Sequence, residues 1–345
     1  MPYAKSIELG AAIKRASAWG GAVACGASDG LLIRSHTIKK KRADLADDSL
    51  GVYFQREADR GDIDVSGDLS CYLRYDGLDL PIALALGQSA GAPAQQGATT
   101  AYSQTLTPVS SIEGLFATLA IDSGINIAEY PTAKFMGLTI KGKAGQPVEV
   151  LFHLRADDML TDSAVNTQAT FADVTIAERS NRVLMSQLTC RINDADGAAL
   201  GGSDEVIPSS FELTFKRRMD AVRTLGSAGA IDEPLEAGRP EITLKMEFPR
   251  YSGDQHFADW DAQTAKKCEL EFTGRLIESP YSRMLRIRMP RLLHTQADLP
   301  IEQGILRHPL EFACLEASSA PSGMSGITAP FVVELINTQS ADVLA

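Results

Sequence analysis

The sequence predicts a mainly β protein built from two tandem antiparallel β-sandwich domains, each with one flanking helix and a long loop arm. Three observations lead to this prediction: apolar and polar residues alternate along several segments, the same succession of segments occurs twice, and helical segments are scarce. A period of two places one set of side chains on a core face and the other on an exposed face of a strand. Antiparallel sheets with one wetted face have this pattern, whereas buried parallel strands are apolar throughout.

The clearest alternating segment runs from residue 62 to residue 73, where the odd positions are apolar and most even positions are polar. Further alternating segments predict strands at 211–216, 241–248 and 285–289, and another strand from residue 310 onward. A strand-like run also covers residues 31–38. The two helix candidates are 78–86 and 257–267, and each follows directly after an alternating strand.

Duplication of one domain explains the order of these segments. A shift of 177 positions brings Gly61 onto Gly238 and aligns the alternating strands and helix candidates of the two halves. The same shift aligns two basic triplets, Lys39, Lys40 and Lys41 with Lys216, Arg217 and Arg218. We therefore expect a first domain at 1–170 and a second at 171–345. The alternative is that alternating strands resemble one another without any duplication.

Each half also has a long polar connection between its basic triplet and the next strand, at residues 43–60 and 220–237. Connections longer than about 12–15 residues are uncommon inside compact domains and are usually functional or disordered. We interpret the two connections as arms that reach a neighbouring subunit. A solvent-exposed mobile loop is the alternative interpretation.

Length and charge limit the function classes. The chain has 345 residues, which favours two domains, and its formal net charge is −11, with 33 Lys+Arg against 44 Asp+Glu. This charge argues against general duplex binding, because nonspecific affinity comes from Lys and Arg that neutralise phosphates. The N-terminus lacks a secretory signal pattern, and no apolar run reaches the roughly 18 residues of a membrane helix. We therefore expect cytoplasmic synthesis and no membrane partner.

No catalytic, metal or cofactor site is predicted. The cysteines are odd in number and far apart, which favours buried free thiols over disulfides or zinc ligation; they are Cys25, Cys71, Cys190, Cys268 and Cys314. The histidines lack ligand spacing, so each is expected to be an ordinary strand or loop residue; they are His36, His153, His256, His294 and His308. Asp62 and Asp64 imitate the start of a calcium loop, but Leu73 stands where the bidentate Glu belongs.

One motif in the sequence resembles a motif of hydrolases. Residues 26–30 read Gly-Ala-Ser-Asp-Gly, which matches the nucleophile-elbow pattern with Ser28 at its centre. The elbow requires a buried strand before the serine and a helix after it. Small residues precede this segment and a strand-like run follows it, so a hydrolase is the weaker alternative function.

The order of these pieces resembles the tail tube proteins of long-tailed bacteriophages. The resemblance begins at residues 14–20 (Lys-Arg-Ala-Ser-Ala-Trp-Gly), includes the strand-like run 31–38 and the connection 43–60, and continues through Val-Ser-Gly at 65–67 into 78–87. It covers essentially the whole chain, because the second half repeats the scheme. The second half departs from the pattern in two ways, since Pro240 interrupts its strand start and no clear Val-Ser-Gly recurs there.

The resemblance implies a structural virion protein, not an enzyme, that needs no cofactor and polymerises into stacked rings around a lumen through which DNA passes. A two-domain chain is expected to form a homotrimeric, pseudo-hexameric ring, whereas a one-domain chain needs a homohexamer. The implied partners are further copies of the chain, the tape measure protein, the tail terminator and tip proteins, and phage DNA as a transient cargo. The implied location is the phage tail, after synthesis in the host cytoplasm. A virion β-sandwich adhesin or carbohydrate-binding module is the main alternative.

Two groups of residues are the candidate sites on this interpretation. A negative wall would repel passing DNA and keep it sliding, and the acidic residues expected to line the lumen are Asp62, Asp64, Asp68, Glu241 and Glu247. The alternative is that these side chains face outward to solvent. The basic triplets are expected to make contacts between subunits or rings, through Lys39, Lys40, Lys41, Lys216, Arg217 and Arg218.

Overall fold

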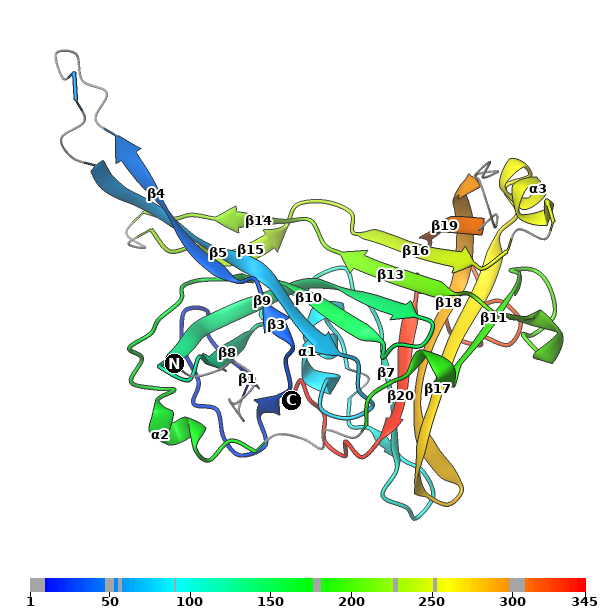
Figure 1. Ribbon diagram of the computed structural model, residues 1–345, viewed down its shortest axis with the longest axis horizontal. Helices are drawn as coiled ribbons and strands as arrows, with labels where there is room; N and C mark the ends of the chain where they lie inside the picture. The colour runs from blue at the N-terminus through cyan, green and yellow to red at the C-terminus, as the bar shows by residue number, and fades with distance from the viewer. Residues whose placement is uncertain are drawn as a thin grey trace.

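A computed structural model describes residues 10–46, 53–54, 58–89, 91–175, 181–225, 229–250, 253–297 and 308–345. The protein is mainly β, with antiparallel strands and short helices, which confirms the predicted fold class (Figure 1). The first half contains β1 (Ala11–Arg15), β2 (Gly30–Leu31), β3 (Ser35–His36), β4 (Lys39–Ala46), β5 (Ala58–Tyr72), α1 (Asp79–Leu86), β6 (Ala94–Gln95), β7 (Tyr102–Leu106), β8 (Ala117–Asp122), β9 (Ile127–Lys143), β10 (Glu149–Ala156) and α2 (Gln168–Phe171). The second half contains β11 (Leu188–Asp194), β12 (Glu205–Val206), β13 (Ser210–Lys216), β14 (Met219–Val222), β15 (Asp232–Glu236), β16 (Glu241–Phe248), α3 (Gln255–Asp261), β17 (Lys266–Glu278), β18 (Tyr281–Ala297), β19 (His308–Cys314) and β20 (Val332–Asn337), preceded by a 3-10 turn at Met185–Gln187 and interrupted by another at Gly202–Asp204.

The same succession of strand pairings occurs in both halves. In the first half β1 pairs with β8, β8 with β9, β9 with β10, β10 with β5, and β5 with β3. In the second half β11 pairs with β17, β17 with β18, β18 with β19, β19 with β16, and β16 with β13. The first strands of the two series begin at Ala11 and Leu188, which are related by the same shift of 177 positions.

The halves are joined by main-chain pairing between β9 and β13. Residues 137–143 of β9 pair with residues 210–216 of β13, so β5, β10, β9, β13, β16 and β19 form one continuous sheet. Gly137 lies at the start of this junction with a φ of +152°, and a Cβ there would lie 2.1 Å from the Phe215 carbonyl oxygen. A glycine is therefore required where the two backbones approach most closely.

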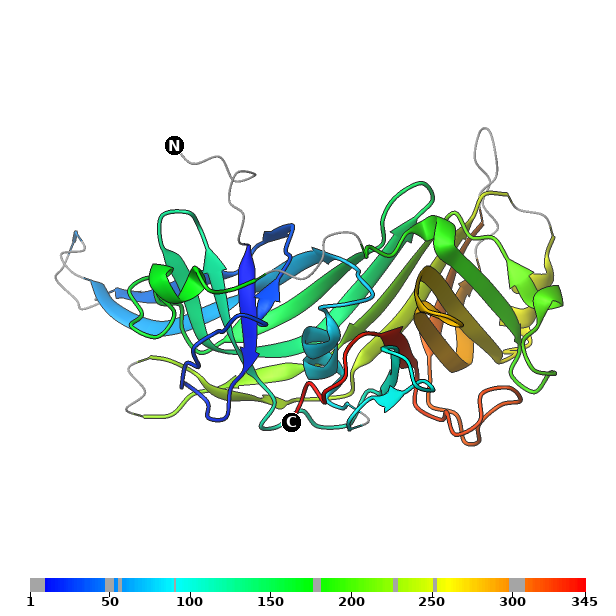
Figure 2. The same ribbon diagram turned by 90° about the horizontal axis from the view of Figure 1, so that it is seen from below.

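One face of this sheet is covered by a hydrophobic core that runs through both halves. Alternate residues of the six strands are fully shielded from solvent, as the period of two requires; one such residue from each strand is Leu69, Phe152, Leu138, Leu213, Leu244 and Phe312. The five cysteines are buried and free, which confirms the prediction for them. Helix α1 lies near the middle of the molecule, below the junction of the halves (Figure 2).

The helices agree only in part with the sequence prediction. Helix α1 coincides with the predicted 78–86, and its buried Asp79 accepts a hydrogen bond from the Asn337 side chain of β20 at 2.6 Å. Burial raises the pKa of Asp79 to about 6. Helix α3 ends at Asp261, so the predicted extension to residue 267 is wrong. Lys267 belongs to β17 instead, where its buried ammonium donates to the Gly197 carbonyl at 2.8 Å.

The two long connections contain β-hairpins. Strand β4 continues to Ala46 and pairs along the start of β5, and β14 pairs with β15 in the same way in the second half. Both hairpins extend from the sheet in Figure 1, and residues 47–52, 55–57 and 226–228 between their strands lie outside the described residues. The predicted strand at 31–38 is reduced to the two short strands β2 and β3.

Candidate functional site

The face of the continuous sheet that lies opposite the core is polar. All five acidic residues predicted to form a site lie on it, three in β5 and two in β16. Cross-strand pairing shows that they share one face, because residues directly opposite each other in neighbouring strands point to the same side. The line of opposite residues runs from β5 to β16 through Asp68, His153, Gly137, Lys216 and Glu241. The structure therefore brings together residues that are far apart in the sequence.

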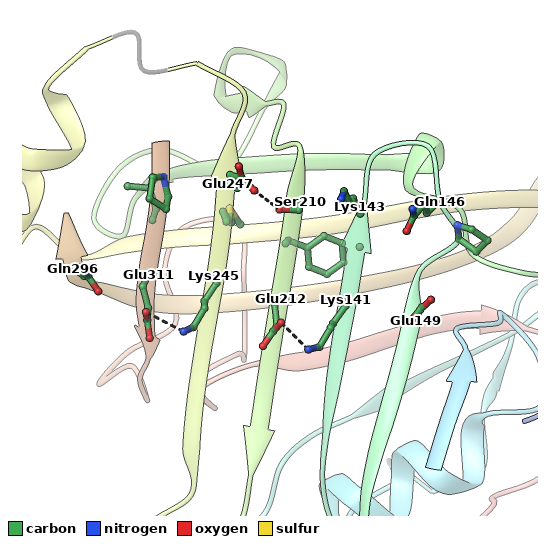
Figure 3. A pocket seen from close by; sticks show the side chains of 16 residues that line it. Lys141, Lys143, Gln146, Glu149, Ser210, Glu212, Lys245, Glu247, Gln296 and Glu311 are labelled. Carbon is green, nitrogen blue, oxygen red and sulfur yellow. Dashed lines mark hydrogen bonds and ion pairs between the residues drawn. The ribbon is translucent and has the colours of Figure 1, made fainter. Parts of the chain in front are cut away.

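A row of alternating charges crosses this face and ends at the uncharged Gln296; it was not predicted from the sequence. The row contains one residue from each of six neighbouring strands, namely Glu149, Lys141, Glu212, Lys245, Glu311 and Gln296. Figure 3 shows the ion pair of Lys141 Nζ with Glu212 Oε2 at 2.9 Å and that of Lys245 Nζ with Glu311 Oε2 at 3.2 Å. These pairs are solvent-exposed, so each contributes little to stability. Their position could be found only once the strand register was known.

Three of the five predicted acidic residues have basic partners. Asp64 bonds to Arg155 at 2.9 Å, Asp68 lies 2.7 Å from the His153 ring, and Asp62 pairs with Arg223 at 3.0 Å. Burial acts to raise the pKa of Asp64, but the hydrogen bonds from Arg155 and Ser66 outweigh this effect and lower it. The expectation of a uniformly negative wall is therefore wrong: the face is polar and carries interleaved charges of both signs.

The basic triplets each divide into one inward and two outward side chains, because side chains alternate along an extended backbone. Lys39 and Lys41 are exposed, whereas Lys40 pairs with Asp158 at 2.5 Å within the chain. In the second triplet Lys216 and Arg218 are exposed and Arg217 is buried. The prediction of a contact between subunits is therefore corrected for Arg217 and Lys40, whose charges are used within the chain.

Arg217 connects the two halves. Its guanidinium donates to the carbonyl of Leu86 at 2.9 Å and to that of Ala85 at 3.4 Å, at the C-terminal end of α1. Burial lowers the pKa of Arg217 to about 10, so it stays charged near neutral pH. A cation is favourable at this end of a helix, where carbonyl groups lack intrahelical partners. A side chain of the second half thus caps the helix of the first.

Replacing Arg217 by methionine is expected to lower the free energy of unfolding by about 2 kcal/mol, because the helix carbonyls lose a charged donor in a buried site. Urea denaturation followed by circular dichroism measures the change. Arg218→Met is the matched control, since Arg218 is exposed, and it should change stability by less than about 0.5 kcal/mol. Equal effects of the two substitutions would contradict the capping role.

The second hairpin, β14–β15, packs on the first half of the same chain. Glu236 accepts a hydrogen bond from the Ile112 amide at 2.7 Å, and Glu233 pairs with the fully buried Lys134. The Trp19 indole donates to the Ile231 carbonyl at 2.9 Å. The first hairpin differs, because Tyr53 and Phe54 between its strands are 90 % and 77 % exposed.

Three of the five histidines gather at one place, although none has ligand spacing in the sequence. His256 of α3, His294 of β18 and His308 of β19 lie together, with ring centroids 5.7 Å apart for His256 and His294 and 5.3 Å apart for His256 and His308. Asp259 of α3 lies beside them. Sequence spacing could not reveal this grouping, because the fold brings together residues of elements that are distant in the sequence.

Comparison with known families identifies the kind of protein that carries this polar sheet face and these hairpins. The family model described as phage tail tube protein matches residues 9–334, which is nearly the whole chain. The chain belongs to the phage tail tube protein family. It is therefore a structural component of the tail tube and a virion protein. No curated protein sequence matches the chain.

The surroundings of Ser28 in this tail tube protein differ from those of a hydrolase nucleophile. Ser28 of the elbow-like motif lies in a turn that follows an irregular segment and precedes the short β2, so the strand–turn–helix context of a nucleophile elbow is not present there. Within the described part of the chain, the helices are too short to span a membrane.

Proposed function

We propose that three copies of this tail tube protein close into a ring, that rings stack into a hollow tube, and that the polar face of the continuous sheet lines the lumen through which DNA passes. In this proposal the chain is a duplication of one tail tube domain, and it acts as an assembly element without catalytic activity. The observation that carries the proposal is the β9–β13 junction, which we take as an internal copy of the contact between subunits.

The free edges of the sheet support ring closure. At Ala133, β9 pairs with β8 along one edge and with β10 along the other. After Ala133, β13 replaces β8 as the partner on the first edge. Leu292 of β18 likewise pairs with β17 on one side and β19 on the other. After Leu292, no strand among the described residues pairs with the edge of β18 that faces β17 before this point. Strand β3, which holds the place of β13 in the first half, pairs among the described strands only with β5.

These two edges are complementary in position. A β18 edge of one copy would therefore pair with the β3 edge of the next, as β9 pairs with β13 inside the chain. A head-to-tail contact of this kind closes into a ring when the rotation between copies allows it, and closure removes exposed strand edges. Since each chain supplies two related units, three chains would give a ring with pseudo-sixfold symmetry.

The hairpins support the same arrangement. Because β14–β15 docks on the first half of its own chain, the equivalent β4–β5 hairpin would dock on the second half of the next copy. Its exposed Tyr53 and Phe54 would then be covered by that neighbour. Lys39, Lys41, Lys216 and Arg218 are exposed and lack the intrachain roles of Lys40 and Arg217. Lys216 lies on the polar face opposite Glu241, so we assign contacts between subunits or rings to Lys39, Lys41 and Arg218.

The polar sheet face suits a surface past which DNA must slide. Because its cations are interleaved with carboxylates, phosphates would find no run of uncompensated Lys and Arg to bind. The tape measure protein would occupy the same lumen before DNA enters, and the terminator and tip proteins would cover the ends of the tube. Electron microscopy of the purified protein, in which we expect rings of three chains stacked into hollow tubes, tests the proposal as a whole.

Reversing acidic charge on this face is expected to slow DNA passage without preventing assembly. In the variant Asp62→Lys, Glu241→Lys and Glu247→Lys, the added cations would bind phosphates, and the half-time of genome ejection should rise by about tenfold or more. Ejection from virions that carry the variant tube can be followed with a DNA-binding dye. We leave Asp64 and Asp68 unchanged because their pairs with Arg155 and His153 are half-buried, whereas the Asp62–Arg223 pair is exposed to solvent.

The matched control carries the same change of charge elsewhere. Asp173, Asp196 and Glu316 are exposed and lie outside the strands of the polar face, so their replacement by lysine should leave ejection unchanged. Equal ejection rates for the two triple variants would contradict the assignment of this face to the lumen.

A further inference from the structure

The histidine cluster beneath α3 contains polar atoms that are shielded from water and lack partners. Both ring nitrogens of His294 and the Nδ1 of His256 are buried without a hydrogen-bond partner among the described residues. Such groups are rare in native proteins, because each costs about 1–3 kcal/mol when it loses water without gaining a partner. A missing ligand or ion is one of the ordinary explanations for them.

The geometry of the cluster fits a metal ion. One ligand atom from each of His256, Asp259 and His294 lies within 4.8 Å of the others. A bound Zn²⁺ takes imidazole nitrogens and carboxylate oxygens at about 2.0–2.2 Å, so small rotations of these side chains would bring them to an ion at their centre. His308 lies edge-on to His256, with ring centroids 5.3 Å apart, and it does not belong to the group whose ligand atoms lie within 4.8 Å of one another.

The surroundings of the three residues support a preformed site. Phe248 stacks on the His256 ring with an interplanar angle of 19°, and Phe312 packs on His294 with ring centroids 4.3 Å apart. Gln255 donates to Oδ1 of Asp259 at 3.0 Å, which orients the carboxylate. Partners of this kind hold metal ligands in position and raise their affinity.

One cation competes for the same carboxylate. Lys266 pairs with Oδ2 of Asp259 at 2.7 Å, but it also pairs with Oδ1 of Asp194 at 2.6 Å. When an ion takes Oδ2 of Asp259, the ammonium of Lys266 can therefore keep a carboxylate partner. The exchange leaves no buried charge without a counter-ion.

We propose that His256, His294 and Asp259 form a binding site for a divalent transition-metal ion of the zinc type, which fastens α3 to β18. The site lies beside the β18 edge to which we assign ring closure, but the proposal does not depend on that assignment, because the ligands all come from one chain. Two histidines and one carboxylate are a donor set typical of zinc, cobalt and nickel.

Isothermal titration of the chelator-treated protein with ZnCl₂, and optical spectra after CoCl₂ addition, test the site. We expect one Zn²⁺ per chain and the intense visible absorption of tetrahedral Co²⁺. His294→Phe keeps an aromatic ring against Phe312, and Asp259→Asn keeps the side-chain size; each should weaken Zn²⁺ binding by about a hundredfold or more. His36→Ala, which removes a histidine outside the cluster, should leave binding unchanged.

Two results of the Zn²⁺ titration would contradict the proposal. Failure of the folded wild-type chain to bind Zn²⁺ would overturn the proposal, and so would binding that both His294→Phe and Asp259→Asn leave intact. Circular dichroism confirms that each variant is folded before titration. The titration uses unassembled protein, so a failure of ring assembly would not affect it.

Discussion

Replacing both Tyr53 and Phe54 by serine is expected to prevent ring assembly while leaving the single chain folded. The two rings pack edge to face, with centroids 4.7 Å apart, and both are almost fully exposed in the isolated chain. Large aromatic side chains that become buried at an interface often contribute 2 kcal/mol or more each to binding. The concentration needed for assembly should therefore rise by about a hundredfold or more.

Analytical ultracentrifugation of the purified variant over a range of concentrations measures this effect. Circular dichroism and the urea midpoint should match those of the wild type, because neither ring packs on the core of its own chain. Ile207→Ser is the control, since Ile207 is a similarly exposed apolar residue, at 84 %, outside the hairpin. Assembly of the double variant at wild-type concentrations would show that the hairpin does not dock on a neighbour.

Replacing Gly137 by alanine is expected to lower the free energy of unfolding by about 3 kcal/mol or more, the largest effect we predict for a single substitution. The added Cβ would lie 2.1 Å from the Phe215 carbonyl oxygen and 2.9 Å from Lys216 Cα, and both are backbone atoms that cannot move aside cheaply. The positive φ adds strain for any residue with a side chain. The β9–β13 junction must therefore separate locally.

Urea denaturation compares this variant with Gly202→Ala, where a Cβ would meet nothing within 4 Å. The control should stay within about 0.5 kcal/mol of the wild type. Because the junction also holds Phe215 against Phe331, the near-ultraviolet circular dichroism of Gly137→Ala should weaken as well. If the free energy of unfolding of Gly137→Ala also stays within about 0.5 kcal/mol of the wild type, the junction does not depend on the close approach of the two strands.

The sequence was sufficient to predict the elements whose side chains follow one simple period. The alternation of residues 62–73 predicted most of β5, and the same pattern correctly predicted β13 and β16. It failed where polar residues occupy both faces of a strand. Strand β4 is of this kind, because it lies in a hairpin that extends from the sheet and is exposed along most of its length.

For the candidate sites, the sequence predicted only which residues within a single strand share a face. Alternation placed Asp62, Asp64 and Asp68 correctly on the polar side of β5, but the neighbours of that side come from other strands. The pairing of Asp68 with His153 depends on the β5–β10 register, and the gathering of His256 and His294 depends on how α3 packs on β18. Such contacts are set by tertiary packing, so a single sequence without relatives cannot reveal them.

Electron microscopy of the purified protein at high concentration tests the central claim most directly. We expect hollow rings made of three chains with six similar lobes, and stacks of these rings forming tubes, because the internal β9–β13 junction would be repeated between copies. Single chains at all concentrations, closed particles without a lumen, or rings made of six chains would contradict the account.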